Sequence, residues 1–192
     1  MTPTILFVPG YWEGPVPFER VITLLISQGY LTEITELVST GTTSPGNPSM
    51  LDDIAGIRLA VQKLVEEDEK DVVLVVHSIA GMLGPCAIEG LGSKARSDAG
   101  LKGGVRKIVF LAALVTPEGF THAPLPFFEY DGGARYCKTP EKLLFNDLDA
   151  VAAEKWVKLA GSQVVRCNAG HMVQISMPEK VAEVVKAAAE EN

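Results

Sequence analysis

Residues 72–81 read Val-Val-Leu-Val-Val-His-Ser-Ile-Ala-Gly, and this stretch decides the fold. The five apolar residues that open it are typical of a parallel β-strand that is buried on both faces. Ser78 follows on a turn, with the small residues Ala80 and Gly81 behind it. A serine on a tight turn between a buried strand and a helix has the arrangement of a nucleophile elbow. Val76 departs from the usual G-x-S-x-G pattern, so a plain strand-to-helix turn is the alternative interpretation.

Apolar strands and amphipathic helices alternate on both sides of this stretch. We expect strands at 5–8, 31–38, 72–76, 107–115 and 164–167, and helices at 18–29, from Asp52 or Asp53 to Val65, and at 149–159. Ser176 and Glu179 have capping-box spacing for a last helix, with Pro178 in its first turn. Pro85 predicts that the helix after Ser78 either kinks or begins about one turn late. The alternation predicts an α/β fold with a parallel sheet of about five strands, covered on both faces.

Length, charge and cysteine content exclude several classes of protein. A chain of 192 residues fits one domain, residues 1–192, that can bury a sizeable core. The net charge of -7 disfavours nucleic acid and anionic membrane surfaces as partners. Three scattered cysteines fit a reducing compartment. The first residues lack the basic region of a signal peptide, and no stretch is long enough to span a membrane, so we expect a cytoplasmic protein.

Two further segments lie where a serine hydrolase needs functional groups. Residues 8–12, Val-Pro-Gly-Tyr-Trp, follow the first strand, where a backbone amide for an oxyanion hole is expected. Residues 168–171, Asn-Ala-Gly-His, follow the last expected strand and precede the last helix. The chain order of Ser78 before His171 agrees with a serine nucleophile and a histidine base.

On these motifs the chain resembles the α/β-hydrolases of the group that includes plant methyl esterases, hydroxynitrile lyases and their fungal hydrolase relatives. The resembling stretches cover most of the chain: 7–10, 52–64, 72–92, 103–119, 145–148 and 166–185. The resemblance implies that Ser78 is the nucleophile and His171 the base. It also implies that the backbone amides of Tyr11 and Ile79 form the oxyanion hole.

The chain departs from these relatives between the cap and the final strand. Relatives have another strand there, with the acidic member of the triad after it, and then a helix. Here Leu159 is followed by Ala-Gly-Ser and at once by the final strand, so one βα unit of about 30 residues and the acid are absent. We therefore expect a reduced α/β-hydrolase fold with a remnant cap at 120–159. The edge left open beside the fourth strand predicts a homodimer.

Several other residues have both a functional and a structural interpretation. Glu118 follows the fourth strand and is the candidate replacement for the triad acid, although relatives share its Pro-Glu-Gly context. The aromatic residues of the cap and the first loop either line an apolar substrate pocket or simply pack the cap; they are Trp12, Phe127, Phe128 and Trp156. His77 is expected to point away from Ser78 in a structural role, and His122 to be an exposed loop residue. No residue grouping has metal-ligand spacing, so neither a metal nor a cofactor is expected.

The leading hypothesis is a cofactor-independent enzyme that acts on a small ester or carbonyl compound. Because loss of the triad acid can cost about 10⁴ in kcat in serine proteases, lyase, isomerase or cyclase chemistry is favoured over efficient ester hydrolysis. The alternative is a non-catalytic protein that binds a small molecule, and a third hypothesis is a decayed or alternatively spliced product.

Overall fold

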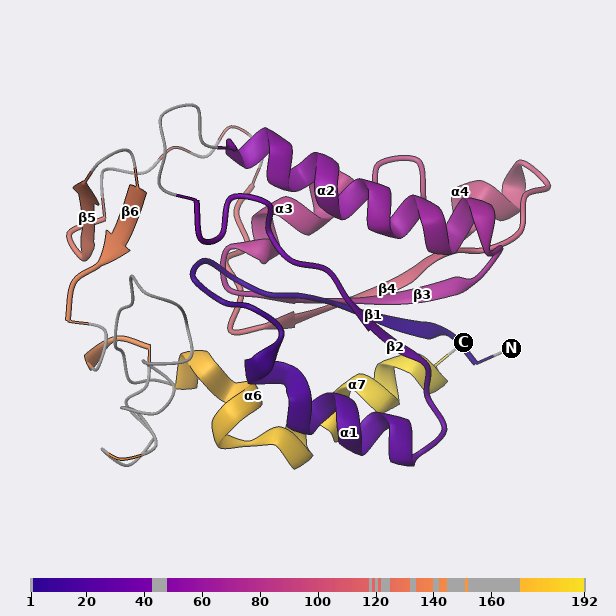
Figure 1. The fold of residues 1–192 in the computed structure, drawn as a ribbon. Helices are drawn as coiled ribbons and strands as arrows, with labels where there is room; N and C mark the ends of the chain where they lie inside the picture. Colours follow the sequence, from indigo (N-terminus) through magenta and orange to yellow (C-terminus); the bar gives the residue numbers. More distant parts are fainter. Residues whose placement is uncertain are drawn as a thin grey trace.

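The computed structural model describes residues 2–42, 48–117, 119, 121, 125–131, 134–139, 142–144, 151 and 170–191. Its main feature is a parallel sheet with the strand order β2-β1-β3-β4 (Figure 1). The strands are β1 (Thr4–Val8), β2 (Thr32–Ile34), β3 (Asp71–His77) and β4 (Gly104–Leu111). The strand with the all-apolar sequence, β3, therefore lies between β1 and β4, as its sequence predicts.

Helices cover both faces of this sheet (Figure 1). One layer holds α1 (Glu19–Ser27) and α7 (Pro178–Glu190), and the other holds α2 (Met50–Gln62), α3 (Ala80–Ala87) and α4 (Ser93–Asp98). Successive strand residues alternate between the layers: Leu74 and Val76 pack with α2 and α3, while Val73 and Val75 pack with α1 and α7. The central strand is therefore buried on both faces, as its sequence predicts.

Two helix starts differ from the expectation. The side chain that caps α2 belongs to Ser49, which forms a capping box with Asp52, whereas Asp53 is buried and accepts hydrogen bonds from Ser39. The Asp53 side chain thus binds a loop residue 14 positions away, a contact that the sequence around α2 does not predict. At the start of α7 the predicted capping box is wrong, because Met177 occupies the cap position without a side-chain bond. Pro178 does lie in the first turn, as expected.

The elements around the elbow also correct the sequence interpretation. The helix α3 begins at Ala80, directly after the turn, and contains Pro85. Of the two outcomes that Pro85 predicted, the late start is therefore wrong, and the kink stays a prediction. Two strands are shorter than expected, since β2 ends at Ile34 and β4 ends at Leu111. The segment between α3 and β4, for which no helix was expected, contains α4.

The cap region contains two strands that were not expected from its sequence. β5 (Phe128–Asp131) and β6 (Ala134–Cys137) form an antiparallel hairpin at the end of the molecule toward which the sheet strands run (Figure 1). The remaining short elements are η1 (Val16–Phe18), the π-helical turn η2 (Lys63–Glu67), η4 (Gly170–Met172) and α6 (Val173–Ser176). The strand expected at 164–167 and the helix expected at 149–159 lie outside the described residues, apart from Val151.

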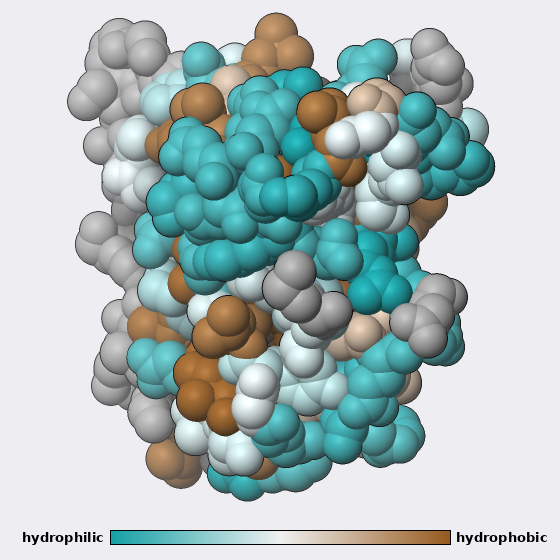
Figure 2. All heavy atoms as spheres, turned by 90° about the vertical axis from the view of Figure 1, so that its right-hand side faces the viewer, coloured by the Kyte–Doolittle hydropathy of each residue, from teal (hydrophilic) through white to brown (hydrophobic). Residues whose placement is uncertain are grey.

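Three surface features are relevant to a homodimer or a membrane as a partner. The end of the molecule where the strands begin is largely hydrophilic, with smaller groups of hydrophobic residues (Figure 2). Among the described strands β4 is the last of the sheet on its side, and Phe110 on this strand is 41% exposed. The homodimer stays a prediction. Within the described ranges, no helix combines the length and the apolar character of a membrane span.

Candidate active site

Ser78 lies on a strained turn between β3 and α3. Its φ of 55° is in the left-handed region, which a residue with a side chain adopts only where the surroundings enforce it. The Ser78 carbonyl accepts hydrogen bonds from the amides of Gly81 (3.1 Å) and Leu114 (2.8 Å), and its own amide donates to the carbonyl of Leu111. The turn is therefore held between the start of α3 and the loop after β4.

Small residues around the turn allow this close packing. A Cβ at Gly81 would lie 2.6 Å from the carbonyl oxygen of Leu114, so only glycine fits there. A Cβ at Gly84 would lie 2.8 Å from Cγ1 of Val76. The space that glycine leaves at position 84 thus accommodates Val76, the residue that departs from the elbow pattern.

The loop after β1 lies directly against the turn. A Cβ on Gly10 would come within 2.6 Å of Ser78 Cβ and 3.2 Å of Ser78 Oγ. The next residue is Tyr11, and Ile79 follows Ser78, so both amides expected for an oxyanion hole belong to backbone at the turn. Within the described part of the chain, neither amide donates a hydrogen bond to another protein group. Two amides that have no acceptor among the described residues, close to a serine hydroxyl, are suited to stabilise a negatively charged oxygen.

His171 reaches the same turn from the far end of the chain. It lies on the 3₁₀ turn η4, which the buried side chain of Met172 anchors to the protein. The distance between His171 Nε2 and Ser78 Oγ is 2.9 Å. This is hydrogen-bond geometry for a nucleophile and its base.

The low pKa of His171 makes the imidazole available as a base at neutral pH, but a weak one. Burial lowers its pKa to about 4, the charge of His77 contributes in the same direction, and the carboxylate of Glu13 acts against both. At neutral pH the imidazole is therefore uncharged and its Nε2 can accept the proton of Ser78. A base with so low a pKa has a small driving force for taking up a proton.

A buried pair beside the site was missed from the sequence. Glu13, in the loop after β1, and His77, the last residue of β3, are both buried, and their Oε2 and Nδ1 atoms lie 2.8 Å apart. Glu13 Oε2 also accepts a hydrogen bond from the amide of Gly10 (3.1 Å), and His77 Nε2 faces the carbonyl of His171. As expected, His77 does not contact Ser78 with its ring nitrogens. The sequence signal for Glu13 was weak: a histidine at the end of a buried strand needs a partner, and Glu13 is the one carboxylate between residues 9 and 18.

Among the described residues, Glu13, His77 and His171 form the one group that could hold a metal ion. The ligating atoms of Glu13, His77 and His171 lie within 4.8 Å of one another. The expectation that no such grouping exists came from sequence spacing, which does not show contacts between segments far apart in the chain. Each of the three already has protein partners, namely Gly10, Ser78 and one another. A metal ion would have to displace these hydrogen bonds.

The aromatic residues of the cap contact the loop after β1. Phe127 and Phe128 are half-buried and pack against each other, and the Phe128 ring lies 5.7 Å from that of Trp12. Arg135 on β6 lies over the ring of Tyr11 and donates a hydrogen bond to its hydroxyl (2.9 Å). The hairpin and the expected oxyanion loop therefore support each other. Three other sequence candidates, Glu118, His122 and Trp156, lie outside the described residues.

A surface pocket of about 540 Å³ lies on the β5–β6 hairpin rather than at Ser78. Its lining residues are Phe128, Glu129, Tyr130, Asp131, Tyr136 and Lys138. The lining mixes charged and aromatic groups and includes neither Ser78 nor His171, so we do not assign it to the substrate.

Comparisons with known proteins agree with this geometry. A model described as the alpha/beta hydrolase family matches residues 5–163. An alpha/beta hydrolase named nvfD, from Aspergillus novofumigatus, is 30% identical over 119 residues, which are 62% of this chain and 46% of that protein. The chain thus matches less than half the length of this curated relative.

Solved structures share the fold at low sequence identity. A pyrethroid hydrolase from Sphingobium faniae JZ-2 superposes with a TM-score of 0.60 at 16% identity, with 99% of this chain and 98% of that chain covered. Tomato methylketone synthase I complexed with 2-tridecanone gives a TM-score of 0.58 at 15% identity, with 98% of each chain covered. The family match spans most of the sequence, and the parallel sheet, elbow and layered helices are those of its fold. The chain belongs to the alpha/beta hydrolase family.

Proposed function

We propose that the chain is a cofactor-independent enzyme that acts on the carbonyl group of a small ester or related compound. The observation that carries the proposal is the 2.9 Å distance between Ser78 Oγ and His171 Nε2 at the carboxyl end of the central strand. In this proposal Ser78 is the nucleophile, His171 is the base, and the amides of Tyr11 and Ile79 bind the developing oxyanion.

The proposed reaction needs only these groups and water. His171 Nε2 takes the proton of Ser78 as Oγ bonds to the carbonyl carbon, and the carbonyl oxygen becomes an oxyanion that faces the two amides. Collapse of this intermediate expels the alcohol, which takes the proton from His171, and leaves an ester on Ser78. A water molecule then repeats the sequence, releases the acid and restores the serine.

We infer that this hydrolysis is slow. Within the described residues, no carboxylate forms a hydrogen bond with the His171 ring, and the pKa of His171 is lowered to about 4, mainly by burial. In a full triad a carboxylate stabilises the imidazolium that forms during attack. Lyase, isomerase and cyclase chemistry can proceed without a carboxylate partner for the base, so we keep these reactions beside slow ester hydrolysis. The low pKa of His171 weakens the base for all of them.

The comparisons support the family but leave the reaction open. The structural neighbours named above are a hydrolase and a synthase, so their shared fold does not choose between the two. Because His171 is a weak base, a second candidate function remains: a protein that binds a small molecule without turning it over.

Steady-state kinetics separates these candidates. We expect measurable but low kcat/KM on p-nitrophenyl acetate and butyrate, lost in Ser78→Ala and in His171→Ala. Ser97→Ala, which alters an exposed serine on α4, is the matched control and should behave as wild type. Activity that survives Ser78→Ala would refute the proposed nucleophile. If the esters are not turned over, a panel of lactones and unsaturated carbonyl compounds tests the hypotheses of lyase, isomerase and cyclase activity.

A further inference from the structure

One buried carboxylate links the segments that carry the proposed reaction. Glu13 is 5% exposed, and its Oε2 accepts hydrogen bonds from the amide of Gly10 and from Nδ1 of His77. Gly10 immediately precedes the amide assigned to the oxyanion hole, and His77 immediately precedes the nucleophile. The carboxylate therefore holds the loop after β1 against the end of β3.

The contacts of His77 favour a charged imidazole. Nδ1 faces the carboxyl group of Glu13 and Nε2 faces the main-chain carbonyl of His171. With Glu13 ionised, both of these groups are acceptors only, and both ring nitrogens carry a proton. In agreement, although burial lowers the pKa of His77, the Glu13 carboxylate and the His171 carbonyl outweigh burial and raise it. Glu13 and His77 form a buried ion pair without net charge.

The second hydrogen bond of His77 extends the link to the base. Nε2 donates to the carbonyl of His171, whose own ring lies against that of His77 with a centroid separation of 4.7 Å. A continuous set of contacts thus runs from Gly10 through Glu13 and His77 to the backbone of His171.

We propose that Glu13 is a positioning residue: through His77 it holds the oxyanion loop and the His171 turn in place around Ser78. This inference rests on the proposed function, because it concerns the same site. Glu13 does not touch the reacting atoms. It fixes the relative position of groups that do, and displacements of about 1 Å in such groups can lower rates about 100-fold.

Two variants of Glu13 and one control separate its charge from its contacts. Glu13→Ala removes both hydrogen bonds, and we expect kcat to fall about 100-fold with a much smaller change in KM. In Glu13→Gln the side-chain oxygen can take the place of Oε2, which both hydrogen bonds share, and accept from Gly10 and from Nδ1 of a neutral His77. Only the hydrogen bond from His77 Nε2 to the His171 carbonyl is then lost, because a neutral ring carries one proton. We therefore expect kcat to return in part. Glu36→Ala, which alters an exposed carboxylate beyond β2 at the same end of the sheet, is the matched control and should leave kcat unchanged.

The pH profile gives a readout that loss of stability does not imitate. Among the described residues, His77 and Glu13 are the charged groups that act on His171. Glu13→Gln removes the charge of His77, which lowers the pKa of His171, and the smaller opposing effect of the Glu13 carboxylate, while burial, the largest cause, remains. The acid limb of kcat/KM should therefore move upward from about 4 by a small amount. A rate of Glu13→Ala equal to wild type, or a Glu13→Gln variant as slow as Glu13→Ala with an unmoved pH profile, would overturn the proposal.

NMR titration of the histidine rings keeps this test independent of turnover. If Glu13→Ala shifts the ring signals and the pKa of His171 in a protein without turnover, the positioning role stands and the proposed function fails. If the wild type turns over substrate but Glu13→Ala changes neither kcat nor the His171 signals, the function stands and the positioning role fails.

Discussion

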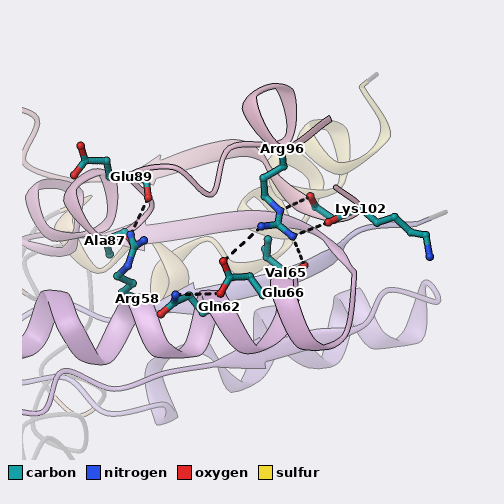
Figure 3. A network of polar contacts seen from close by, with 9 residues as sticks. Arg58, Gln62, Val65, Glu66, Ala87, Glu89, Arg96 and Lys102 are labelled. Carbon is teal, nitrogen blue, oxygen red and sulfur yellow. Dashed lines mark hydrogen bonds and ion pairs between the residues drawn. The ribbon is translucent and has the colours of Figure 1, made fainter. Parts of the chain in front are cut away.

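Two buried cations lie near opposite ends of the sheet, and each is bound by one carboxylate and by main-chain carbonyls. The carboxylate partner of Arg96 is half-exposed, whereas that of His77 is buried. Arg96 on α4 donates to the carbonyls of Val65, Lys102 and Gly103 and pairs with Glu66, beside the start of β4 (Figure 3). His77 at the end of β3 pairs with Glu13 and the His171 carbonyl.

The partners of the two cations also differ in their distance along the chain. The carbonyls bound by Arg96 lie 6 to 31 residues away in the sequence, whereas the partners of His77 lie 64 and 94 residues away. Arg96 therefore connects segments that are close in the sequence. His77 connects the distant segments that carry the proposed nucleophile, base and oxyanion amides. We expect the first to contribute to stability alone and the second to both stability and rate.

The largest effect is expected at His77. His77→Leu leaves the Glu13 carboxylate buried without its charge partner, and this should lower the free energy of unfolding by about 4 kcal/mol. Glu13→Met combined with His77→Leu should recover a large part of that loss without recovering activity, because no charge remains buried but the links to Gly10 and His171 are gone. Urea denaturation of both variants measures this. A double variant less stable than His77→Leu would show that the ion pair is not the origin of the loss.

Removal of Arg96 should cost less and leave the chemistry intact. Arg96→Met deprives three carbonyls of their donor, and we expect a loss of roughly 2 kcal/mol in the free energy of unfolding. The rate per folded molecule should equal that of wild type, since none of its contacts reaches Ser78. A reduced kcat in fully folded Arg96→Met would remove the contrast between the two ends of the sheet.

The pH dependence should follow His171. Its pKa of about 4 in the folded protein lies below the ordinary 6.5, so the folded state binds fewer protons between these values. The free energy of unfolding should therefore decrease as the pH falls from about 6.5 to about 4, and kcat/KM should persist down to the same low pH. Urea titrations at several pH values and a pH–rate profile measure both. An acid limb near 6.5 would contradict the burial of the imidazole.

The smallest effect is expected where the β5–β6 hairpin contacts the loop after β1. Tyr11→Phe removes the hydroxyl that accepts the hydrogen bond of Arg135, an exposed contact worth about 1 kcal/mol. KM should rise severalfold, with kcat nearly unchanged, because the Tyr11 amide stays in place. A fall in kcat as large as that of Glu13→Ala would show that the cap, rather than the buried pair, holds the loop.

The sequence predicted those parts of the fold that depend on local pattern. The apolar run of β3 and the small residues behind Ser78 are enough to place a strand, a turn and a helix. The lengths of β2 and β4 were overestimated, because apolar character continues past the point where pairing ends. The hairpin was missed since its strands are exposed and lack a clear alternation of apolar residues.

The contacts between distant segments could not be predicted in the same way. Aspartate is a residue type that often caps a helix, yet the Asp53 carboxylate accepts hydrogen bonds from Ser39. The residue that caps α2 is Ser49. Glu13 and His77 meet only once the sheet has formed, because they belong to different strand ends. The place of His171 beside Ser78 was expected from the family resemblance, whereas no spacing in the sequence gives its distance.

Covalent labelling of Ser78 tests the central claim, that Ser78 and His171 form a nucleophile and base, most directly. The protein is incubated with a fluorophosphonate at pH 7.5 and the adduct is located by intact mass and peptide mass spectrometry. We expect one adduct, on Ser78, that is absent from Ser78→Ala and forms at least about 100-fold more slowly in His171→Ala, while Ser97→Ala reacts as wild type. An unlabelled wild type, or equal labelling of wild type and His171→Ala, would contradict the account.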